Sequence, residues 1–418
     1  MQILVLDTIH GGIILGDALR GMGHIVYLVD VYRGDLSHPG SITSETAMSR
    51  RYDLLIHPVH LDPSYPVLRA LSCPAITHHE AVRWILGSGR QKMQPGDQKT
   101  GHSIEITGTR GKTTTATALA SLIQGSGILH TSRGVFRYPG EEKLIRMSIT
   151  PASLIPVYDL LSEDEWCISE ISLGFTGLAD LAILTSDEDY LVASGRLSAR
   201  ILKTLSALSC RRVLIAPGMT IEHDSVINAG DLTHVSGATC TYSYRDINGS
   251  FDNPLLTLKG YRIPLQLATA AALILGYRPD RLSNFTPLPG RMKIISEEDR
   301  MIIDNASTGA CLTTTLDAIA LIRGTDDLNI PFTLIIGQEN RAVCENFSDE
   351  EIIASIRKGR PVKVILVAGD DRMNIDAISG ACQNLAVPII TVNSITEGMQ
   401  VAKEKSACPI VVSVKTWR

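Results

Sequence analysis

Seven consecutive residues are the part of this sequence best suited to chemistry, and they run Gly108-Thr109-Arg110-Gly111-Lys112-Thr113-Thr114. The run follows an apolar segment that predicts a strand and precedes a segment of good helix formers, 113–124. Glycines let successive backbone amides converge on phosphate oxygens, and a helix N-terminus adds partial positive charge. Lys112 would then reach the β- and γ-phosphates of a nucleotide, and the Thr113 hydroxyl would ligate Mg²⁺. The sequence therefore predicts a phosphate-binding loop at 108–114.

The general pattern of such loops, G-x-x-x-x-G-K-[ST], places a first glycine five positions before its second one. Ile106 stands at that position, so the match to the general loop is incomplete. The alternative interpretation is a solvated turn with a chance Lys-Thr-Thr. The position between a predicted strand and a predicted helix favours the phosphate-binding loop.

A nucleotide bound through Mg²⁺ needs a second group that orients the metal, and the ends of neighbouring parallel strands supply such groups. Glu170 ends the predicted strand 166–171 and is the candidate metal ligand beside Thr113; an exposed strand-end acid is the alternative. The next predicted strand, 181–185, is followed by the acidic run 186–190, for which a solvated loop is the alternative. Lys203 lies on a predicted helix, where a lysine considered alone would be placed at the surface.

The composition is that of a globular chain of 418 residues. Lys plus Arg number 39 and Asp plus Glu number 44, and the resulting net charge of −5 disfavours electrostatic binding of nucleic acid. The 8 cysteines are scattered, and no two have the spacing of metal ligands. The longest strongly apolar stretch, 268–275, is far shorter than the ~20 residues that a membrane span requires. We expect a cytoplasmic protein that binds neither nucleic acid nor membrane.

Alternating apolar strands and helical segments predict an α/β fold, and this alternation restarts twice along the chain. The predicted parts are a Rossmann-like domain at 1–98, a central ATP-binding domain at 99–290 and a Rossmann-like domain at 291–418. The polar stretch 88–101 is the expected linker after the first domain. Gly11 and Gly12 follow the first predicted strand, but their spacing differs from G-x-G-x-x-G, which favours a structural scaffold over a dinucleotide site.

The loop without its usual first glycine resembles the ATP-binding loop of the Mur ligase family, which includes the peptidoglycan amino-acid-adding ligases and folylpolyglutamate synthase. Thr150-Pro151 resembles the family's Thr-Pro after this loop, and Glu170 resembles its Mg²⁺ carboxylate. Pro289-Gly290-Arg291 is similar to the Gly-Arg that opens the family's C-terminal domain, and the segment 304–308 is similar to its ribose-holding loop. The resemblance implies the three-domain Mur ligase architecture, in which Rossmann-like first and last domains flank a central P-loop ATPase-type parallel sheet.

The resemblance also implies a reaction. ATP, bound with Mg²⁺, converts a substrate carboxylate to an acyl phosphate, which a nucleophile attacks to release ADP and phosphate. The implied catalytic residues are Lys112, Glu170 and Lys203, with Thr113 and Glu170 as metal ligands. The loop and the resemblance together indicate the ATP-binding residues Gly108, Thr109, Arg110, Gly111, Lys112, Thr113, Thr114, Arg291, Asp304 and Asn305.

Two positions depart from the family's pattern. Asp189-Tyr190 stands where typical members carry Asp-His for a second Mg²⁺, and a phenol with a pKa of about 10 is a poor ligand for a hard cation. A second metal site is therefore left open. Lys203 stands near the place of a carbamylated lysine in many members, in a segment that fits loosely, so its modification is also left open.

Several further segments, 6–12, 30–32, 77–82 and 190–196, resemble the archaeal branch of the family that completes coenzyme F430, the nickel tetrapyrrole of methanogenesis. This resemblance implies a nickel-containing tetrapyrrole substrate, the seco-acid precursor. Its propionate would be activated by ATP, and a carbon of the same molecule would then close the last carbocycle. Nickel enters only as part of the substrate. The substrate-binding candidates are His10, His78 and His79 in these segments and Arg133, Arg137 and Arg146 for peripheral carboxylates.

Two other functions are compatible with the sequence. A Mur-type ligase that joins an amino acid to a carboxylate, in pseudomurein or a polyglutamyl chain, would share the ATP chemistry and consume an external amine. A nucleotide-binding regulatory protein without ligase activity is the alternative from another class, because Tyr190 replaces the family's histidine. The sequence is compatible with a monomer or a homodimer.

Overall fold

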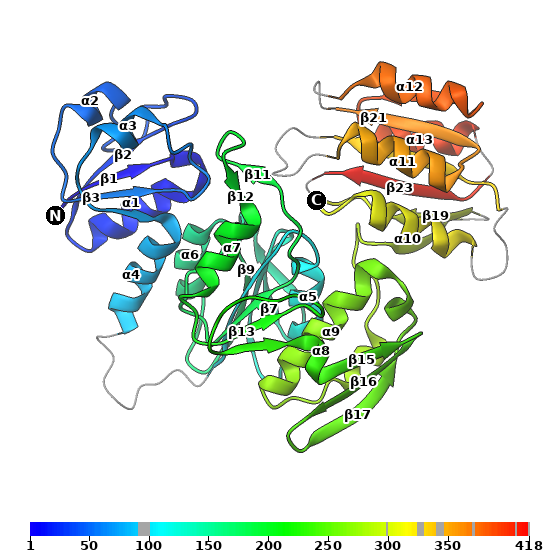
Figure 1. Cartoon of the computed structure of the whole chain (residues 1–418), viewed down its shortest axis with the longest axis horizontal. Helices are drawn as coiled ribbons and strands as arrows, with labels where there is room; N and C mark the ends of the chain where they lie inside the picture. The colour runs from blue at the N-terminus through cyan, green and yellow to red at the C-terminus, as the bar shows by residue number, and fades with distance from the viewer. Residues whose placement is uncertain are drawn as a thin grey trace. The chain divides into compact units, whose positions relative to one another are not determined.

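The computed structural model describes residues 1–90, 101–297, 300–323, 330–339, 347–369, 373–405 and 408–416. Within these ranges the strands form three large sheets that are mainly parallel and two small ones (Figure 1). The chain divides into two compact units. Unit 1 comprises Met1–His234, Cys240–Phe251 and Ile263–Leu282, and unit 2 comprises Val235–Thr239, Asp252–Arg262 and Ser283–Arg418. No helix among the described residues is long and apolar enough to cross a membrane.

The N-terminal sheet has the strand order β2-β1-β3-β4, and these pairs are parallel. Residues 3–6 of β1 are all buried, as expected for a parallel strand that is covered on both faces. The chain passes from β1 to β2 on one side and returns to β3 on the other, so the switch point of this sheet lies between β1 and β3. The elements are β1 (Gln2–Leu6), η1 (Thr8–Gly12), α1 (Ile13–Gly21), β2 (Ile25–Val29), α2 (Ser44–Met48), β3 (Leu54–His57), α3 (Pro66–Ala70), β4 (Ala75–Thr77) and α4 (His78–Arg90).

Helix α4 corrects the predicted linker at 88–101, because the helix continues to Arg90. Ser88 donates a hydrogen bond to the Trp84 carbonyl one turn earlier, at 2.8 Å, so a polar residue fits inside the helix. The rest of the predicted linker at 91–100, with the boundary between 98 and 99, lies outside the described residues.

The central sheet has the order β14-β13-β10-β5-β9-β6-β7-β8. Its strands pair in parallel from β14 to β6, and β7 and β8 extend it in antiparallel fashion. The strands predicted at 103–107, 166–171 and 181–185 are confirmed. The elements of this sheet and its connections are β5 (Ser103–Thr107), α5 (Lys112–Ala120), β6 (Gly127–Thr131), β7 (Gly134–Tyr138), β8 (Glu142–Ile145), η2 (Pro151–Ser153), α6 (Leu154–Asp159), β9 (Trp166–Glu170), β10 (Leu181–Leu184), α7 (Ala199–Ala207), β13 (Val213–Ile215) and β14 (Val226–Asn228).

Two smaller sheets follow from segments that carry no strong apolar pattern. They are a hairpin of β11 (Leu191–Val192) with β12 (Leu197–Ser198), and a three-stranded sheet of β15 (Thr233–Ser236), β16 (Thr239–Tyr244) and β17 (Ile247–Asp252). The helical elements of this part are α8 (Ala229–Leu232), η3 (Pro254–Thr257), α9 (Lys259–Ile274) and η4 (Asp280–Asn284).

The C-terminal sheet has the order β18-β19-β23-β20-β21-β22, in which the pair of β18 and β19 is antiparallel and the others are parallel. Its elements are β18 (Lys293–Glu297), β19 (Arg300–Asp304), α10 (Leu312–Arg323), β20 (Thr333–Gln338), α11 (Asp349–Gly359), β21 (Lys363–Ala368), α12 (Ile375–Asn384), β22 (Ile389–Val392), α13 (Ile395–Lys405) and β23 (Ile410–Lys415). The α/β fold with parallel-sheet domains is confirmed. The three large sheets fall within the predicted ranges 1–98, 99–290 and 291–418, whose boundaries stay predictions.

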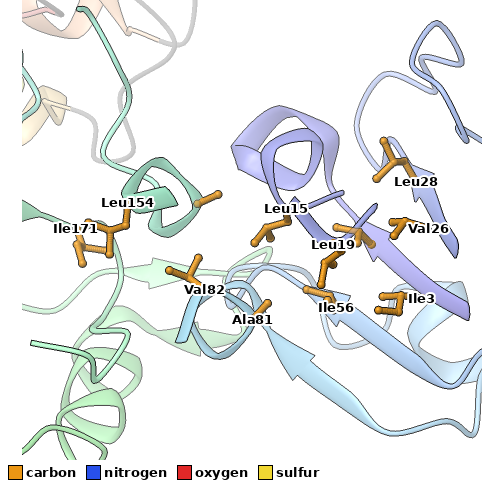
Figure 2. Close-up of a cluster of buried hydrophobic side chains, with 12 residues drawn as sticks. Ile3, Leu15, Leu19, Val26, Leu28, Ile56, Ala81, Val82, Leu154 and Ile171 are labelled. Carbon is orange, nitrogen blue, oxygen red and sulfur yellow. The ribbon is translucent and has the colours of Figure 1, made fainter. Parts of the chain in front are cut away.

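One apolar cluster of unit 1 joins N-terminal helices to the central segments (Figure 2). Val82 of α4 is packed in this cluster with Leu15 of α1, and Leu154 and Ile171 extend it from the central part. Burial of a side chain of this size contributes about 1.5–3 kcal/mol. Because Ile171 directly follows the last residue of β9, the cluster also holds the strand end that carries the candidate metal ligand.

Candidate active site

The predicted phosphate-binding loop connects β5 to α5 at the carboxyl edge of the central sheet. Gly108 has a φ of 143°, and a Cβ atom at this position would lie 2.1 Å from Thr185 Oγ1 at the end of the neighbouring strand. Gly111 is left-handed, with a φ of 82°, and caps α5. The first-turn amides of a helix have no acceptor one turn earlier, so they are directed towards the loop. The predicted sequence of strand, loop and helix is confirmed.

The structure brings Lys112, Thr113 and Glu170 together. Lys112 Nζ donates to the Gly108 carbonyl at 2.9 Å and lies 3.8 Å from Glu170 Oε1. The Thr113 hydroxyl donates to Glu170 Oε2 at 2.8 Å. Glu170 is only 2% exposed at the end of β9, which adjoins β5 in the sheet. A hydroxyl and a buried carboxylate in contact are a donor set that suits Mg²⁺, and the ammonium beside them suits phosphate.

Ser132 and Ser186 also contact the candidate site; the sequence analysis did not name Ser132, and it mentioned Ser186 only as part of the run 186–190. The amides of Thr109 and Arg110 donate to Ser186 Oγ at 2.9 and 3.1 Å, so two loop amides converge on one oxygen. The Ser132 amide donates to Glu170 Oε2 at 3.1 Å. Both serines follow the carboxyl end of a strand, and this position is the signal that could have identified them.

Lys203 is buried at the loop, which corrects the surface position that the residue considered alone would suggest. Its side chain comes from α7 and is 2% exposed. Nζ donates to the Thr109 hydroxyl at 2.9 Å and lies 4.8 Å from the centroid of the Tyr190 ring. The Thr109 hydroxyl in turn donates to the Glu188 carbonyl at 2.7 Å. The residue that departs from the family's pattern, Tyr190, therefore contacts the lysine by its ring face.

The acidic run 186–190 mainly stabilises the backbone at the N-terminus of α7. Asp189 Oδ1 accepts from the Arg200 amide at 3.0 Å and from the Ser198 hydroxyl at 2.8 Å, at the N-terminus of α7. The hydrogen bond from the Arg200 amide is the main reason that the pKa of Asp189 is lowered. Glu188 pairs with Arg110 Nε at 2.8 Å. The run thus positions the helix that carries Lys203.

The predicted ribose loop lies in unit 2, beside the segment that carries Arg291. Asp304 Oδ2 accepts from the Gly290 amide at 3.1 Å, and its Oδ1 accepts from the Ala306 amide at 3.2 Å. Asn305 is buried, and its side chain donates to the hydroxyls of Thr314 and Ser413. Asp304 and Asn305 therefore brace this loop from within.

The chain is similar over its whole length to a protein of Methanosarcina acetivorans. It is 31% identical over 490 aligned residues to the coenzyme F(430) synthetase of Methanosarcina acetivorans, and the match covers 100% of this chain and 99% of the relative. A profile of "Coenzyme F430 synthetase CfbE, C-terminal domain" matches residues 294–416. The chain belongs to the coenzyme F430 synthetase family. Membership in this family supports the predicted class of enzyme, an ATP-dependent ligase.

Solved structures with the same fold are Mur ligases and their relatives. The UDP-N-acetylmuramoylalanyl-D-glutamyl-2,6-diaminopimelate--D-alanyl-D-alanyl ligase of Acinetobacter baumannii matches with a TM-score of 0.55 at 14% identity, covering 83% of this chain and 78% of that one. The folylpolyglutamate synthase/dihydrofolate synthase of Yersinia pestis, complexed with AMPPNP and a Mn ion, has a TM-score of 0.55 at 14% identity and covers 81% and 90%. The predicted Mur ligase architecture is confirmed.

Two of the three candidate substrate histidines are buried by the fold. His78 Nε2 lies 3.0 Å from the Leu6 carbonyl, and His79 Nε2 lies 3.0 Å from the Ser172 carbonyl. Burial lowers the pKa of His78 to about 3 and the pKa of His79 to about 4, so both are neutral at pH 7. These contacts favour structural roles, in which α4 is fastened to β1 and to the central part. His10 differs, because its side chain is 42% exposed.

Acid is expected to destabilise the folded chain through His78 and His79. Their folded pKa values lie below the value of about 6.5 of an unfolded histidine, so the unfolded chain binds protons first as the pH falls. The free energy of unfolding then decreases below about pH 6.5, by at most ~1.4 kcal/mol per pH unit for each histidine. Thermal unfolding at neutral and mildly acidic pH checks this expectation. His79→Gln should lose less stability than the wild type when the pH is lowered. An equal loss in both proteins would contradict this expectation.

The three candidate arginines lie around β7 and β8 but in different environments. Arg137 on β7 pairs with Glu165 at 2.6 Å and donates to the Leu160 carbonyl, so it fastens the strand to a loop. Arg133 lies over the Phe136 ring, with its guanidinium carbon 5.5 Å from the centroid. Arg146 is exposed just after β8. Of the three, only Arg146 is exposed; Arg133 and Arg137 are half-buried, and Arg137 is already paired with Glu165.

Proposed function

We propose that this chain is an ATP-dependent ligase that closes the final carbocyclic ring of coenzyme F430. Its substrate is the nickel seco-acid precursor, whose propionate is activated as an acyl phosphate with release of ADP and then phosphate. The contact of Lys112, Thr113 and Glu170 at the ends of β5 and β9 carries the ATP half of the proposal. The name of the Methanosarcina relative supports the choice of substrate.

The residues at the loop fit ATP with Mg²⁺. Thr113 and Glu170 would hold the ion, because a hydroxyl and a carboxylate are hard oxygen ligands and their oxygens already lie 2.8 Å apart. Bound Mg²⁺ supplies neutralisation of phosphate charge and alignment of the transferred group. Lys112 places a positive charge at the same point, with its Nζ held by the Gly108 carbonyl. Arg291, Asp304 and Asn305 of unit 2 are proposed as further ATP-binding residues, as the family resemblance implies.

The reaction balances without an external oxidant or reductant. A propionate oxygen forms a bond to the γ-phosphorus of ATP, and the bond from that phosphorus to ADP breaks. A carbon of the same substrate then forms a bond to the acyl carbon, loses a proton, and phosphate leaves. The chain contributes positioning and stabilisation of negative charge, which together account for most catalysis of phosphoryl transfer.

Lys203 acts in this proposal as an unmodified ammonium. The face of an aromatic ring attracts a cation, and Nζ lies 4.8 Å from the centroid of Tyr190. A carbamate would bring a negative group to the same ring face, where the ring's charge distribution disfavours it. The ammonium donates to the Thr109 hydroxyl and so supports the conformation of the phosphate-binding loop.

We expect Lys203→Ala to reduce ATP turnover by about 100-fold, because a preorganised positive group next to the loop is lost. Carbon NMR of the purified chain in isotopically labelled bicarbonate should show no carbamate signal. Short carboxylic acids should not restore activity to Lys203→Ala, since they replace a carbamate and not an ammonium. A carbamate signal, or rescue by such acids, would show that Lys203 is modified.

The experiment that tests the function is anaerobic incubation of the chain with ATP, Mg²⁺ and the nickel seco-acid, followed by mass analysis of the tetrapyrrole. We expect the loss of one water from the substrate, with one ADP and one phosphate released for each ring closed. Turnover that requires an added amino acid would instead indicate an amide-forming ligase. Absence of ADP release with every substrate would favour the regulatory alternative.

A further inference from the structure

A second cluster of reactive side chains lies in the N-terminal sheet, at the carboxyl ends of β1 and β3. Asp7 directly follows β1, and His60 lies three residues after His57, the last residue of β3. These neighbouring strands border the switch point of the sheet, which is where open α/β sheets bind ligands. His10 comes from η1, the segment between β1 and α1.

One carboxylate oxygen and two imidazoles converge in this cluster. Asp7 Oδ2 lies 2.6 Å from His10 Nδ1 and 3.7 Å from His60 Nε2. One donor atom from each of the three residues lies within 4.8 Å of the others. The two imidazole rings meet edge to face, with their centroids 4.8 Å apart. This spacing is short enough for one ion to contact all three residues after small side-chain rotations.

Asp7 is held in place for this role by its backbone surroundings. Its side chain is 0% exposed, and Oδ1 accepts from the amides of Ile9 and His10 at 3.0 and 3.1 Å. These bonds direct Oδ2 towards the imidazoles. Asp7 also has a φ of 73°, a conformation that costs a non-glycine residue about 1–3 kcal/mol and is found most often at functional sites. A carboxylate removed from water in this way is stabilised by a nearby cation.

The two histidines keep the cluster accessible. Their side chains are 42% exposed for His10 and 23% exposed for His60, whereas Asp7 lies beneath them. The Tyr32 ring flanks His10 edge to face, with the centroids 5.4 Å apart. An ion can therefore enter from solvent past the imidazoles and keep coordination positions on the exposed side.

We propose that Asp7, His10 and His60 form a binding site for a divalent transition metal ion of the zinc type. Two imidazole nitrogens and one carboxylate oxygen are a ligand set of open zinc sites, which hold water or a substrate oxygen in their remaining positions. The ion takes the place of the hydrogen between His10 Nδ1 and Asp7 Oδ2, and that proton passes to solvent or to Nε2. Ligand atoms of a tetrahedral site lie about 3.3 Å apart, so the exposed His10 ring rotates slightly from its 2.6 Å contact.

This site differs in chemistry from the Mg²⁺ site proposed at the phosphate-binding loop. The loop offers the hydroxyl of Thr113 and the carboxylate of Glu170, which are hard oxygen ligands. The N-terminal cluster offers two imidazoles, which favour zinc, cobalt or nickel over magnesium. Excess Mg²⁺ is therefore expected to fill the first site and leave the second available. The proposal does not depend on which substrate the chain acts on.

The test uses the full chain, stripped of metal with a chelator and kept in excess Mg²⁺, with Co²⁺ and Zn²⁺ as probes. We expect one Co²⁺ per chain after gel filtration, with the visible absorption bands of a low-symmetry nitrogen and oxygen site. Zn²⁺ should displace the Co²⁺ and abolish these bands. A chain that retains no stoichiometric Co²⁺ or Zn²⁺ would overturn the proposal, as would an intense sulfur charge-transfer band, which indicates a cysteine site.

Variants locate the ion. His10→Ala and His60→Ala should each reduce the affinity for Zn²⁺ by about 100-fold or more, since loss of a supporting residue alone costs 10–100-fold. His38→Ala is the matched control, because Asp35 and His38, in the segment between β2 and α2, repeat the three-residue spacing of Asp7 and His10, with 4.0 Å between their side chains. The affinity of His38→Ala for Zn²⁺ should equal that of the wild type.

Thermal unfolding separates binding from folding. Zn²⁺ should raise the unfolding temperature of the wild type and of His38→Ala, and should leave that of His60→Ala unchanged. If His60→Ala fails to unfold cooperatively, His60→Gln serves in its place. Full Zn²⁺ affinity in the double variant of His10 and His60 would overturn the assignment.

Discussion

Replacement of Lys112 by alanine is expected to reduce ATP turnover by about 1000-fold and to leave the unfolding temperature within a few degrees of the wild type. The Lys112 ammonium lies between the Gly108 carbonyl, at 2.9 Å, and Glu170 Oε1, at 3.8 Å, and its side chain is 17% exposed. A preorganised donor in such a site is worth roughly 2.7–4 kcal/mol in the transition state. A full positive charge that meets a transferring phosphoryl group belongs at the upper end of that range. Release of ADP, followed by a coupled assay, measures the effect.

Two further variants make this result specific. Lys358→Ala removes an exposed lysine from α11 and should have wild-type turnover, which excludes an effect of net charge alone. Lys112→Arg keeps the charge and changes its shape, so it should recover only part of the activity. Turnover close to wild type in Lys112→Ala would remove the assignment of residues 108–114 to the nucleotide phosphates.

Glu170→Gln is the second variant with a large expected effect. We expect turnover at millimolar Mg²⁺ to fall by about 100-fold, and the concentration of Mg²⁺ needed for half-maximal rate to rise. Glutamine preserves the shape of the side chain and can accept from Thr113, as Glu170 Oε2 does at 2.8 Å, but it lacks the negative charge that holds the cation. The variant therefore separates charge from packing. Titration with Mg²⁺ and Mn²⁺ under initial-rate conditions provides the measurement.

Glu105→Gln is the matched control for this change. Glu105 is a second buried carboxylate of the same sheet, on the neighbouring strand β5, and it accepts from the Thr176 amide at 2.7 Å. Burial raises the pKa of Glu105, and glutamine keeps the shape of its side chain. We expect no change in the Mg²⁺ requirement of this variant. An unchanged Mg²⁺ requirement in Glu170→Gln would contradict the proposed ion site.

The strand, loop and helix around residues 108–114 were predictable because their signals are local. Gly108 and Gly111 lie next to each other in sequence with Lys112 and Thr113, and a short segment between a strand and a helix can adopt only a few conformations. Glu170 could be added because parallel strands place their carboxyl ends at one edge of a sheet, and β5 and β9 are neighbours.

Burial and long-range contacts were not predictable in the same way. The sequence analysis named His78 and His79 as substrate-binding candidates, and the packing of α4 places both of them inside. Ser186 reaches the loop amides only because β10 lies beside β5, a neighbour relation that no short segment encodes.

The sequence by itself determined the α/β alternation, the strand, loop and helix around residues 108–114 and the residue types available there, because each depends on residues close together along the chain. Only the tertiary structure decided that Lys203 meets Thr109, 94 residues earlier, and that His60 meets Asp7 across the switch point of the first sheet. The physical reason is that contacts between distant segments depend on strand order and on which side chains the packed helices bury. Strand order and burial are established only when the whole sheet and its helices assemble, and no local pattern specifies them.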